Sequence, residues 1–239
     1  MFAKHLSFLT AAIACGSTLS AGSLALPTYS VGLTYSGGAS PISQNYTAPG
    51  SYNFGGMSVG LAGSPDPSIQ VSAGLYGSAG ASESYYFTVS GGPDGTTVPL
   101  LVFYSMTATA SQTVSASSLA LLNVRSYIDG ASAEVGNLGL ASQSMSGFLR
   151  INYLIGTAYD PGSVTLQASA SGPSTAFVDP FIEVDPSFLN ASSYSVTVSP
   201  GIGNSALSST PEPASFALVG VGLIGAMLVR RRLALHCRG

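Results

Sequence analysis

Alternation of apolar and polar residues is the feature that most restricts how this chain can fold. In the segment before the C-terminal tail, Tyr194, Val196 and Val198 are separated by single polar residues. Successive side chains of a β-strand point to opposite faces, so this pattern is typical of a strand with one buried face. A helix would repeat its apolar residues every three or four positions, and the sequence shows no long run of that kind away from its two ends.

The same alternation recurs along the chain and predicts a set of short strands. They are expected at residues 85–90, 98–106, 148–155 and 163–170, with further strands near 29–35, 52–60, 69–76 and 177–184. Residues 119–128 fit either a strand or a short helix. Residues 73–84, rich in glycine, alanine and serine, are expected to form a loose loop.

Turn signals separate these segments and point to a fold class. Gly91-Gly92-Pro93-Asp94-Gly95 and Tyr159-Asp160-Pro161-Gly162 each join two expected strands. Many short strands joined by such turns predict an all-β protein, an antiparallel β-sandwich or its jelly-roll variant. We assign the sandwich to residues 26–204 and a short polar linker to residues 205–210.

The N-terminal segment, residues 1–25, has the organisation of a secretory signal peptide. Lys4 and His5 precede an apolar stretch that contains no acid, and small residues lead up to a cleavage position after Ala25. A lipoprotein signal ending at Cys15 is the alternative, although the usual aliphatic residue is missing. The signal predicts Sec-type export of the sandwich, which is then an ectodomain.

The C-terminal segment, residues 211–239, combines three features of a targeting signal. Pro211-Glu212-Pro213 is followed by the uncharged run 214–229 and then by Arg230-Arg231-Arg232. As a helix the run would be about 24 Å long, close to the thickness of a bilayer core, so we predict a transmembrane helix at 214–229. The arginines would stop transfer and stay on the cytoplasmic side. An ordinary uncleaved membrane anchor is the simpler alternative.

This three-part tail resembles the PEP-CTERM sorting domain, which a membrane-embedded exosortase recognises in exopolysaccharide-producing Gram-negative bacteria. The resemblance implies that Pro211, Glu212 and Pro213 form the sorting motif and that an exosortase-like enzyme is a partner. It implies an inner-membrane precursor whose mature form reaches the cell envelope or is secreted. It further implies a structural or adhesive role in the extracellular matrix or biofilm, with exopolysaccharide as a second partner.

Composition excludes several classes of function for the ectodomain. Nine acids and only Arg125 and Arg150 as bases give residues 26–204 a formal charge of −7, against −3 for the whole chain. Such a surface argues against nucleic acid as a partner. The ectodomain has no His, Cys, Lys or Trp, so it cannot build a Ser-His-Asp triad or an ordinary zinc site. We therefore expect a protein without enzymatic activity or a cofactor.

Two sets of residues remain as candidate sites in the ectodomain. Asp179, Glu183 and Asp185 are weak candidates for a calcium site, and Glu183 with Asp185 would share one strand face as the carboxylate pair of a glycoside hydrolase. A solvent-facing strand edge explains them more simply. The main alternative function is a carbohydrate-binding sandwich, with Tyr85, Tyr86 and Tyr104 on an exposed face.

Overall fold

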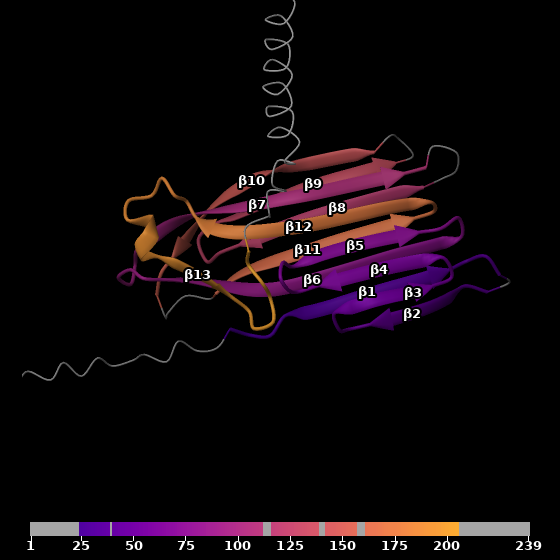
Figure 1. The fold of residues 1–239 in the computed structure, drawn as a ribbon, viewed down its shortest axis with the longest axis horizontal. Coiled ribbons are helices and arrows are strands. Elements are labelled where there is room, and N and C mark those ends of the chain that lie inside the picture. Colours follow the sequence, from indigo (N-terminus) through magenta and orange to yellow (C-terminus); the bar gives the residue numbers. More distant parts are fainter. Residues whose placement is uncertain (1–23, 39, 112–115, 139–141, 157–160, 206–239) are drawn as a thin grey trace, which may run out of the picture.

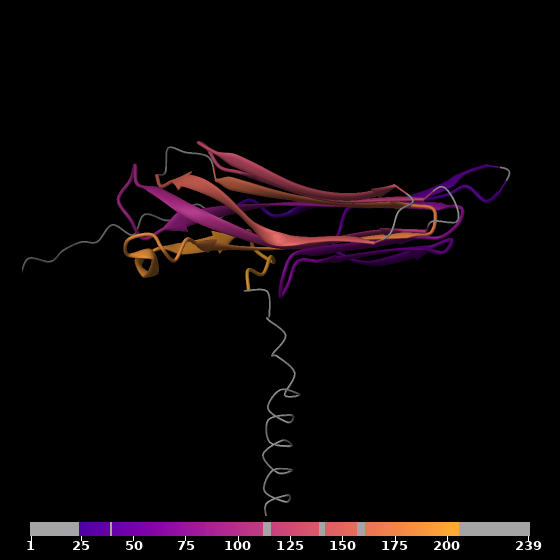
Figure 2. The ribbon, with the colours of Figure 1, turned by 90° about the horizontal axis from the view of Figure 1, so that it is seen from above.

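The computed structural model describes residues 24–38, 40–111, 116–138, 142–156 and 161–205. Over these residues the chain forms two antiparallel β-sheets packed face to face (Figures 1 and 2). The predicted antiparallel β-sandwich is therefore confirmed. The predicted sorting and transmembrane segments lie outside the described residues, as does the predicted signal segment up to residue 23.

Sheet A contains seven strands. Their order is β2 (Ile42–Tyr46), β1 (Thr28–Tyr35), β6 (Gly77–Ser90), β11 (Gly162–Ser171), β8 (Ser117–Arg125) and β9 (Gly130–Leu138). The seventh strand, β13 (Ser195–Val198), pairs with the C-terminal half of β6. It follows a single 3-10 turn at Ala191–Ser193.

Sheet B contains six strands. Their order is β10 (Gln143–Leu154), β7 (Thr97–Ala110), β12 (Ser174–Val184), β5 (Ser68–Ala73), β4 (Met57–Ala62) and β3 (Gly50–Phe54). The edge strands β9 and β10 lie at one margin of the sandwich, and β2 and β3 lie at the other (Figure 1). Stacked Tyr46 and Tyr52 rings, with centroids 4.0 Å apart, join β2 to β3 across that second margin.

The core lies between the sheets and follows the predicted alternation. Tyr85 and Phe87 of β6 point inward from sheet A, and Leu100 and Met106 of β7 point inward from sheet B; all four are almost fully buried. Burying side chains of this size contributes about 1.5–3 kcal/mol each. The inward faces of both sheets therefore form one continuous apolar core.

Three segments differ from the sequence-based expectation. The loop expected at 73–84 is mostly strand, because β6 begins at Gly77 and pairs with β1 on one side and with β11 on the other. Its small residues alternate between the two faces of the sheet, and those on the inward face are buried. The strand expected at 52–60 is a hairpin, since Gly55 and Gly56 adopt positive φ angles of 55° and 80° and reverse the chain. Residues 119–128, left open between helix and strand, belong to β8 as far as Arg125.

The chain after β13 is fastened to the sheets by side-chain hydrogen bonds. The Asn204 amide oxygen accepts from the Ile182 N–H at 2.9 Å, and its amide nitrogen donates to the Ile182 carbonyl at 2.8 Å. This pair continues sheet B beside β12, beyond the point where β5 stops pairing at Val178. The Gly203 N–H donates to the Gly63 carbonyl at 2.6 Å. These contacts determine where the chain leaves the sandwich.

Replacement of Gly203 by alanine is expected to destabilise the sandwich by about 2–4 kcal/mol. A Cβ at this position would overlap the backbone carbonyl of Pro65, and backbone cannot move aside cheaply. The free energy of urea unfolding measures the effect. Gly60→Ala is the matched control, since a Cβ there meets no atom within 4 Å. Equal stability of the two variants would contradict the prediction.

Candidate functional site

Three phenylalanines lie side by side on the outer face of sheet B. Phe103 of β7 pairs in register with Phe148 of β10 on one side and with Phe181 of β12 on the other. The ring centroids of Phe103 and Phe148 are 5.9 Å apart, and those of Phe103 and Phe181 are 6.2 Å apart. We call this set the aromatic row. Phe148 is 55% exposed and the other two rings are half-buried.

Strand alternation places these rings outside the core. Val102 and Tyr104, the neighbours of Phe103, are buried between the sheets, so Phe103 points away from them. The same holds for Phe181 on β12, whose neighbour Ile182 is buried. Large apolar rings in register on an outer face form a contiguous apolar surface rather than scattered exposed residues.

Polar residues flank the aromatic row on both sides. Two positions along the strands in one direction, Ser146, Ser105 and Asp179 are in register across β10, β7 and β12. In the other direction the register brings Arg150 and Glu183 to either side of Leu101. The surface thus combines flat aromatic rings with hydroxyl, carboxyl and guanidinium groups. This is the chemistry that a polyhydroxylated ligand with apolar C–H faces requires.

Asp179 is a carboxyl group of this surface whose pKa is raised. Burial, and secondarily the negative charge of Asp66, raise its pKa to about 6. Its Oδ1 atom is buried without a hydrogen-bond partner among the described residues. Asp179 therefore gains a proton in mildly acidic conditions and can then act as a hydrogen-bond donor.

The prediction that Glu183 and Asp185 share one strand face is wrong. Strand β12 ends at Val184, and Asp185 begins the turn that follows. The Asp185 side chain, 5% exposed, accepts hydrogen bonds from Arg150 Nη2 at 2.6 Å and from the Ser187 hydroxyl at 2.6 Å. Hydrogen bonds from Ser187, and then the charge of Arg150, lower the pKa of Asp185. Asp185 therefore ties this turn to β10.

The three acidic candidates do not assemble into one site. Asp179 and Glu183 share the outer face of β12, but four residues of strand separate them by about 13 Å. Asp185 is engaged elsewhere, by Arg150 and Ser187. Within the described ranges, no three His, Cys, Asp or Glu side chains come close enough together to hold a metal ion.

The tyrosine face expected for carbohydrate binding is also wrong. Tyr85 and Tyr104 point into the core and are almost fully buried. Tyr86 lies on the outside of sheet A and is half-buried. Adjacent residues of one strand must point to opposite faces, so Tyr85 and Tyr86 cannot share a surface. The aromatic row replaces them as the aromatic surface of the sandwich.

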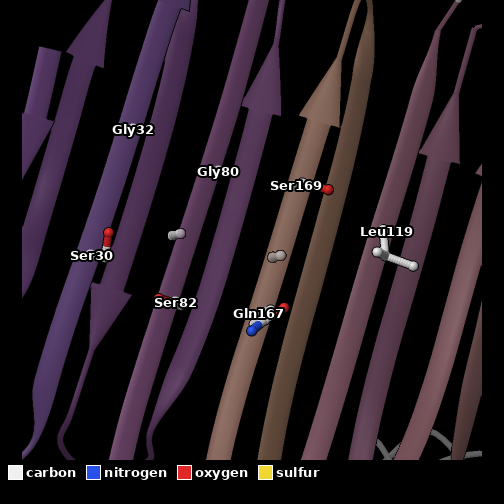
Figure 3. A pocket seen from close by; sticks show the side chains of 9 residues that line it. Ser30, Gly32, Gly80, Ser82, Leu119, Gln167 and Ser169 are labelled. Carbon is white, nitrogen blue, oxygen red and sulfur yellow. The ribbon is translucent and has the colours of Figure 1, made fainter.

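A shallow depression of about 390 Å³ lies on the outer face of sheet A (Figure 3). It crosses β1, β6, β11 and β8 where Gly32 and Gly80 present no side chain. Ser30, Ser82 and Ser169 surround it with hydroxyl groups, and Gln167 adds an amide. Its lining has hydrogen-bonding groups but no aromatic ring and no charge. It therefore lacks the stacking surface that sheet B offers.

Glu83, like the aromatic row, was not predicted from the sequence. It points from β6 into the core, is 0% exposed, and its two carboxyl oxygens have no hydrogen-bond partner in the described part of the chain. Burial raises its pKa to about 8. Tyr29 lies opposite Glu83 on the neighbouring strand β1. Burial, with the Glu83 charge as the second cause, also raises the pKa of Tyr29 and of Tyr85. Glu83 lies two residues before Tyr85, so strand alternation predicts that both side chains point to the same face.

The predicted sorting residues lie outside the described residues. This applies to Pro211, Glu212 and Pro213, and to Arg230, Arg231 and Arg232. Ala25, the predicted cleavage position, is described, and its carbonyl accepts a hydrogen bond from the Ser199 hydroxyl at 2.7 Å. In the part of the chain that the structure covers, no helix has the length and apolar character needed to span a bilayer.

The fold and the C-terminal end of the sequence define a class, an exported β-sandwich protein with a C-terminal sorting signal. Residues 209–232 match the PEP-CTERM protein-sorting motif. The resemblance predicted from the sequence is confirmed, and the chain carries a PEP-CTERM domain. The motif implies an exosortase as partner and an exported protein that is processed at the membrane.

Other comparisons give weaker similarities. No curated protein matches the chain. TmCBM61 in complex with β-1,4-galactotriose is 16% identical over 54% of this chain and 83% of its own, with a TM-score of 0.27. The arabinose-bound α-L-arabinofuranosidase MgGH51 is 16% identical over 54% and 22%, with a TM-score of 0.24. The enzymatically active domain of bacteriophage CBA120 tailspike protein 4 is 8% identical over 66% and 19%, with a TM-score of 0.28. TM-scores this low carry no inference about this chain.

Proposed function

We propose that this exported protein is an adhesive component of the cell surface or extracellular matrix of a biofilm, and that it attaches to neutral polysaccharide through the aromatic row. The observation that carries the proposal is the in-register placement of Phe148, Phe103 and Phe181 on an open sheet face. Rings in this arrangement can stack on the apolar faces of successive sugars. The flanking serines and carboxyl groups can bond to sugar hydroxyls.

Charge favours a neutral glycan over an anionic one. The ectodomain carries a formal charge of −7, and its cations, Arg125 and Arg150, cannot offset nine acids. Arg150 is moreover engaged by Asp185. An anionic polysaccharide would be repelled by this surface, whereas a neutral one is not. Exopolysaccharide without charged groups is therefore the ligand class that fits best.

Phe148→Ala is expected to weaken binding to a neutral polysaccharide by about tenfold, because one stacking ring contributes about 1–1.5 kcal/mol. Affinity electrophoresis against a panel of soluble neutral and anionic polysaccharides measures the retardation of the purified protein. Tyr76→Ala is the matched control, since Tyr76 is 58% exposed and lies in the turn between β5 and β6, away from the row. Equal retardation of both variants, or none for the parent protein with any polysaccharide, would contradict the proposal.

The proposed function does not include enzymatic activity. A glycoside hydrolase using Glu183 and Asp185 would need two carboxyl groups on either side of one bond, about 5–10 Å apart and free to exchange protons. Asp185 is instead held by Arg150 and Ser187. Release of reducing sugars from the bound polysaccharide, lost in Glu183→Gln, would overturn this part of the proposal.

A further inference from the structure

Strand β10 is a long edge strand without the usual protection. It has twelve residues, whereas β2 and β3 at the opposite margin have five each. Its sequence contains no proline, lysine or acid. Natural edge strands are commonly shielded by such residues because an open edge pairs readily with another strand. β10 is therefore the strand of the sandwich best suited to pair with a further strand.

The backbone of β10 presents unpaired groups away from β7. The N–H of Asn152 donates to Asp129 Oδ2 at 3.0 Å, and its carbonyl accepts from the Ser126 hydroxyl at 2.6 Å. These contacts show that the backbone of Asn152 points outward and is covered by the turn between β8 and β9. By the alternation of an antiparallel ladder, the backbone groups of four further residues point the same way. They are Ser144, Ser146, Phe148 and Arg150.

None of these four residues has a backbone partner on that side among the described residues. The open stretch ends at Asn152, where Ser126 and Asp129 cover the edge. At the other end β10 begins at Gln143. The centre of the open stretch is therefore Gly147.

Exposed apolar side chains lie on the same strand. Phe148 is 55% exposed on the outer face, and Met145 is 38% exposed on the opposite face of the strand. The one charged residue of β10, Arg150, is bonded within the chain to Asp185. An added strand would thus cover apolar surface without bringing like charges together.

We infer that the β10 edge pairs with the β10 edge of a second copy of this chain, antiparallel and centred on Gly147. In this register Ser144 faces Arg150 of the second copy, and Ser146 faces its Phe148. All four outward residues then use both their N–H and C=O groups. Phe148 of each copy then lies diagonally across the joint from Phe148 of the other, so the two aromatic rows meet with an offset, and Met145 packs against Leu149 of the second copy. The pairing concerns an edge and does not depend on polysaccharide binding by the sheet face.

A second copy is the partner that this edge favours, because its β10 strand presents the same four open residues together with the exposed Phe148 and Met145. The strand carries no acid although the ectodomain as a whole is acidic, so two copies repel least along this line. Two-fold pairing of this kind buries the same surface on both partners.

A cysteine at the centre of the joint tests the pairing in the full-length protein. The background carries Cys15→Ser and Cys237→Ser, which removes both native cysteines. In the proposed register, residue 147 faces itself in a non-hydrogen-bonded pair, about 4.5 Å between Cα atoms, which a disulfide can span. We expect Gly147→Cys to form disulfide-linked dimers in cell envelopes on mild oxidation. Ser43→Cys on the edge strand β2 is the control and should stay monomeric on a non-reducing gel.

A second measurement does not depend on the cysteine. Ser146→Pro removes one outward N–H but no hydrogen bond to β7, so the sandwich keeps its own ladder. Sedimentation of the detergent-solubilised full chain should show a dimer for the parent and about tenfold weaker association for the variant. A parent that sediments as a monomer, a cross-link from residue 147 to another protein, or equal linkage of the two cysteine variants would overturn the inference.

Discussion

Cells producing Glu212→Ala should retain the precursor in the inner membrane and release little or none of the mature protein. Residues 209–232 match the PEP-CTERM sorting motif, and Glu212 supplies the only negative charge in that segment. We expect Glu212 to be part of what the exosortase recognises, because it stands between the two prolines of the matched motif. Cell fractionation and the intact mass of the protein in each fraction measure the effect.

The controls separate recognition from membrane insertion. Ser208→Ala lies just outside the matched segment and is expected to be processed like the parent. Replacement of Arg230, Arg231 and Arg232 by alanine should also impair processing, because it removes the charges that we predict to stop transfer through the membrane. Release of Glu212→Ala at the rate of the parent would show that the motif is not the processing signal of this protein.

The stability of the sandwich should fall as the pH rises from about 4.5 to about 8. Glu83 has a folded-state pKa of about 8 against 4.5 for the unfolded chain, so the folded state holds its proton more tightly. Below pH 4.5 both states are protonated and the burial of Glu83 carries no charge penalty. Between the two values the unfolded state loses its proton first, and stability declines by about 3–5 kcal/mol in total.

Glu83→Gln should remove most of this pH dependence. The variant is expected to match the parent near pH 4.5 and to exceed its stability by a few kcal/mol above pH 8, since glutamine stays neutral. Urea unfolding of the purified ectodomain at both pH values measures the difference. Glu134→Gln is the control, because Glu134 is exposed on β9 and its replacement should leave the profile unchanged. A parent whose stability is the same at both pH values would contradict the buried, protonated Glu83.

Asp179 and Asp185 also contribute to the pH profile, in opposite directions. The raised pKa of Asp179, about 6, makes stability fall as the pH rises from about 4 to 6. The lowered pKa of Asp185 adds stability above its ordinary pKa that is lost in stronger acid. The comparison of Glu83→Gln with the parent isolates Glu83 from both, because the two aspartates are unchanged.

Local periodicity was sufficient to predict the fold class. Alternation around Val196, Leu166 and Phe87 marked strands with one buried face, and all three segments are strands of the sandwich. The sorting motif in the C-terminal tail was also predicted from the sequence, since such a signal is a contiguous stretch of residues. Predictions failed where composition concealed the pattern, as in β6, whose first half is built from small residues.

The surface sites depend on neighbours that are distant in the sequence. Phe148 and Phe103 meet because strands 45 residues apart pair in one register, and no local pattern states that register. Asp185 does not pair with Glu183 as predicted, because β12 ends at Val184 and Asp185 lies in the turn that follows. There it is bonded to Arg150, which belongs to a strand from another part of the chain. Glu83 became a buried acid because it lies on the inward face of β6, which packs against β4 and β5 of sheet B.

Most strand positions, the alternation of side chains between the two faces of a strand and the C-terminal sorting signal follow from contiguous residues, because alternation and motif recognition act over a few positions. The aromatic row, the open edge of β10 and the environment of each acid arise only when separate strands are brought into register. Loop closure and the packing of two sheets determine that register through contacts between distant residues, which the linear order of the chain does not display.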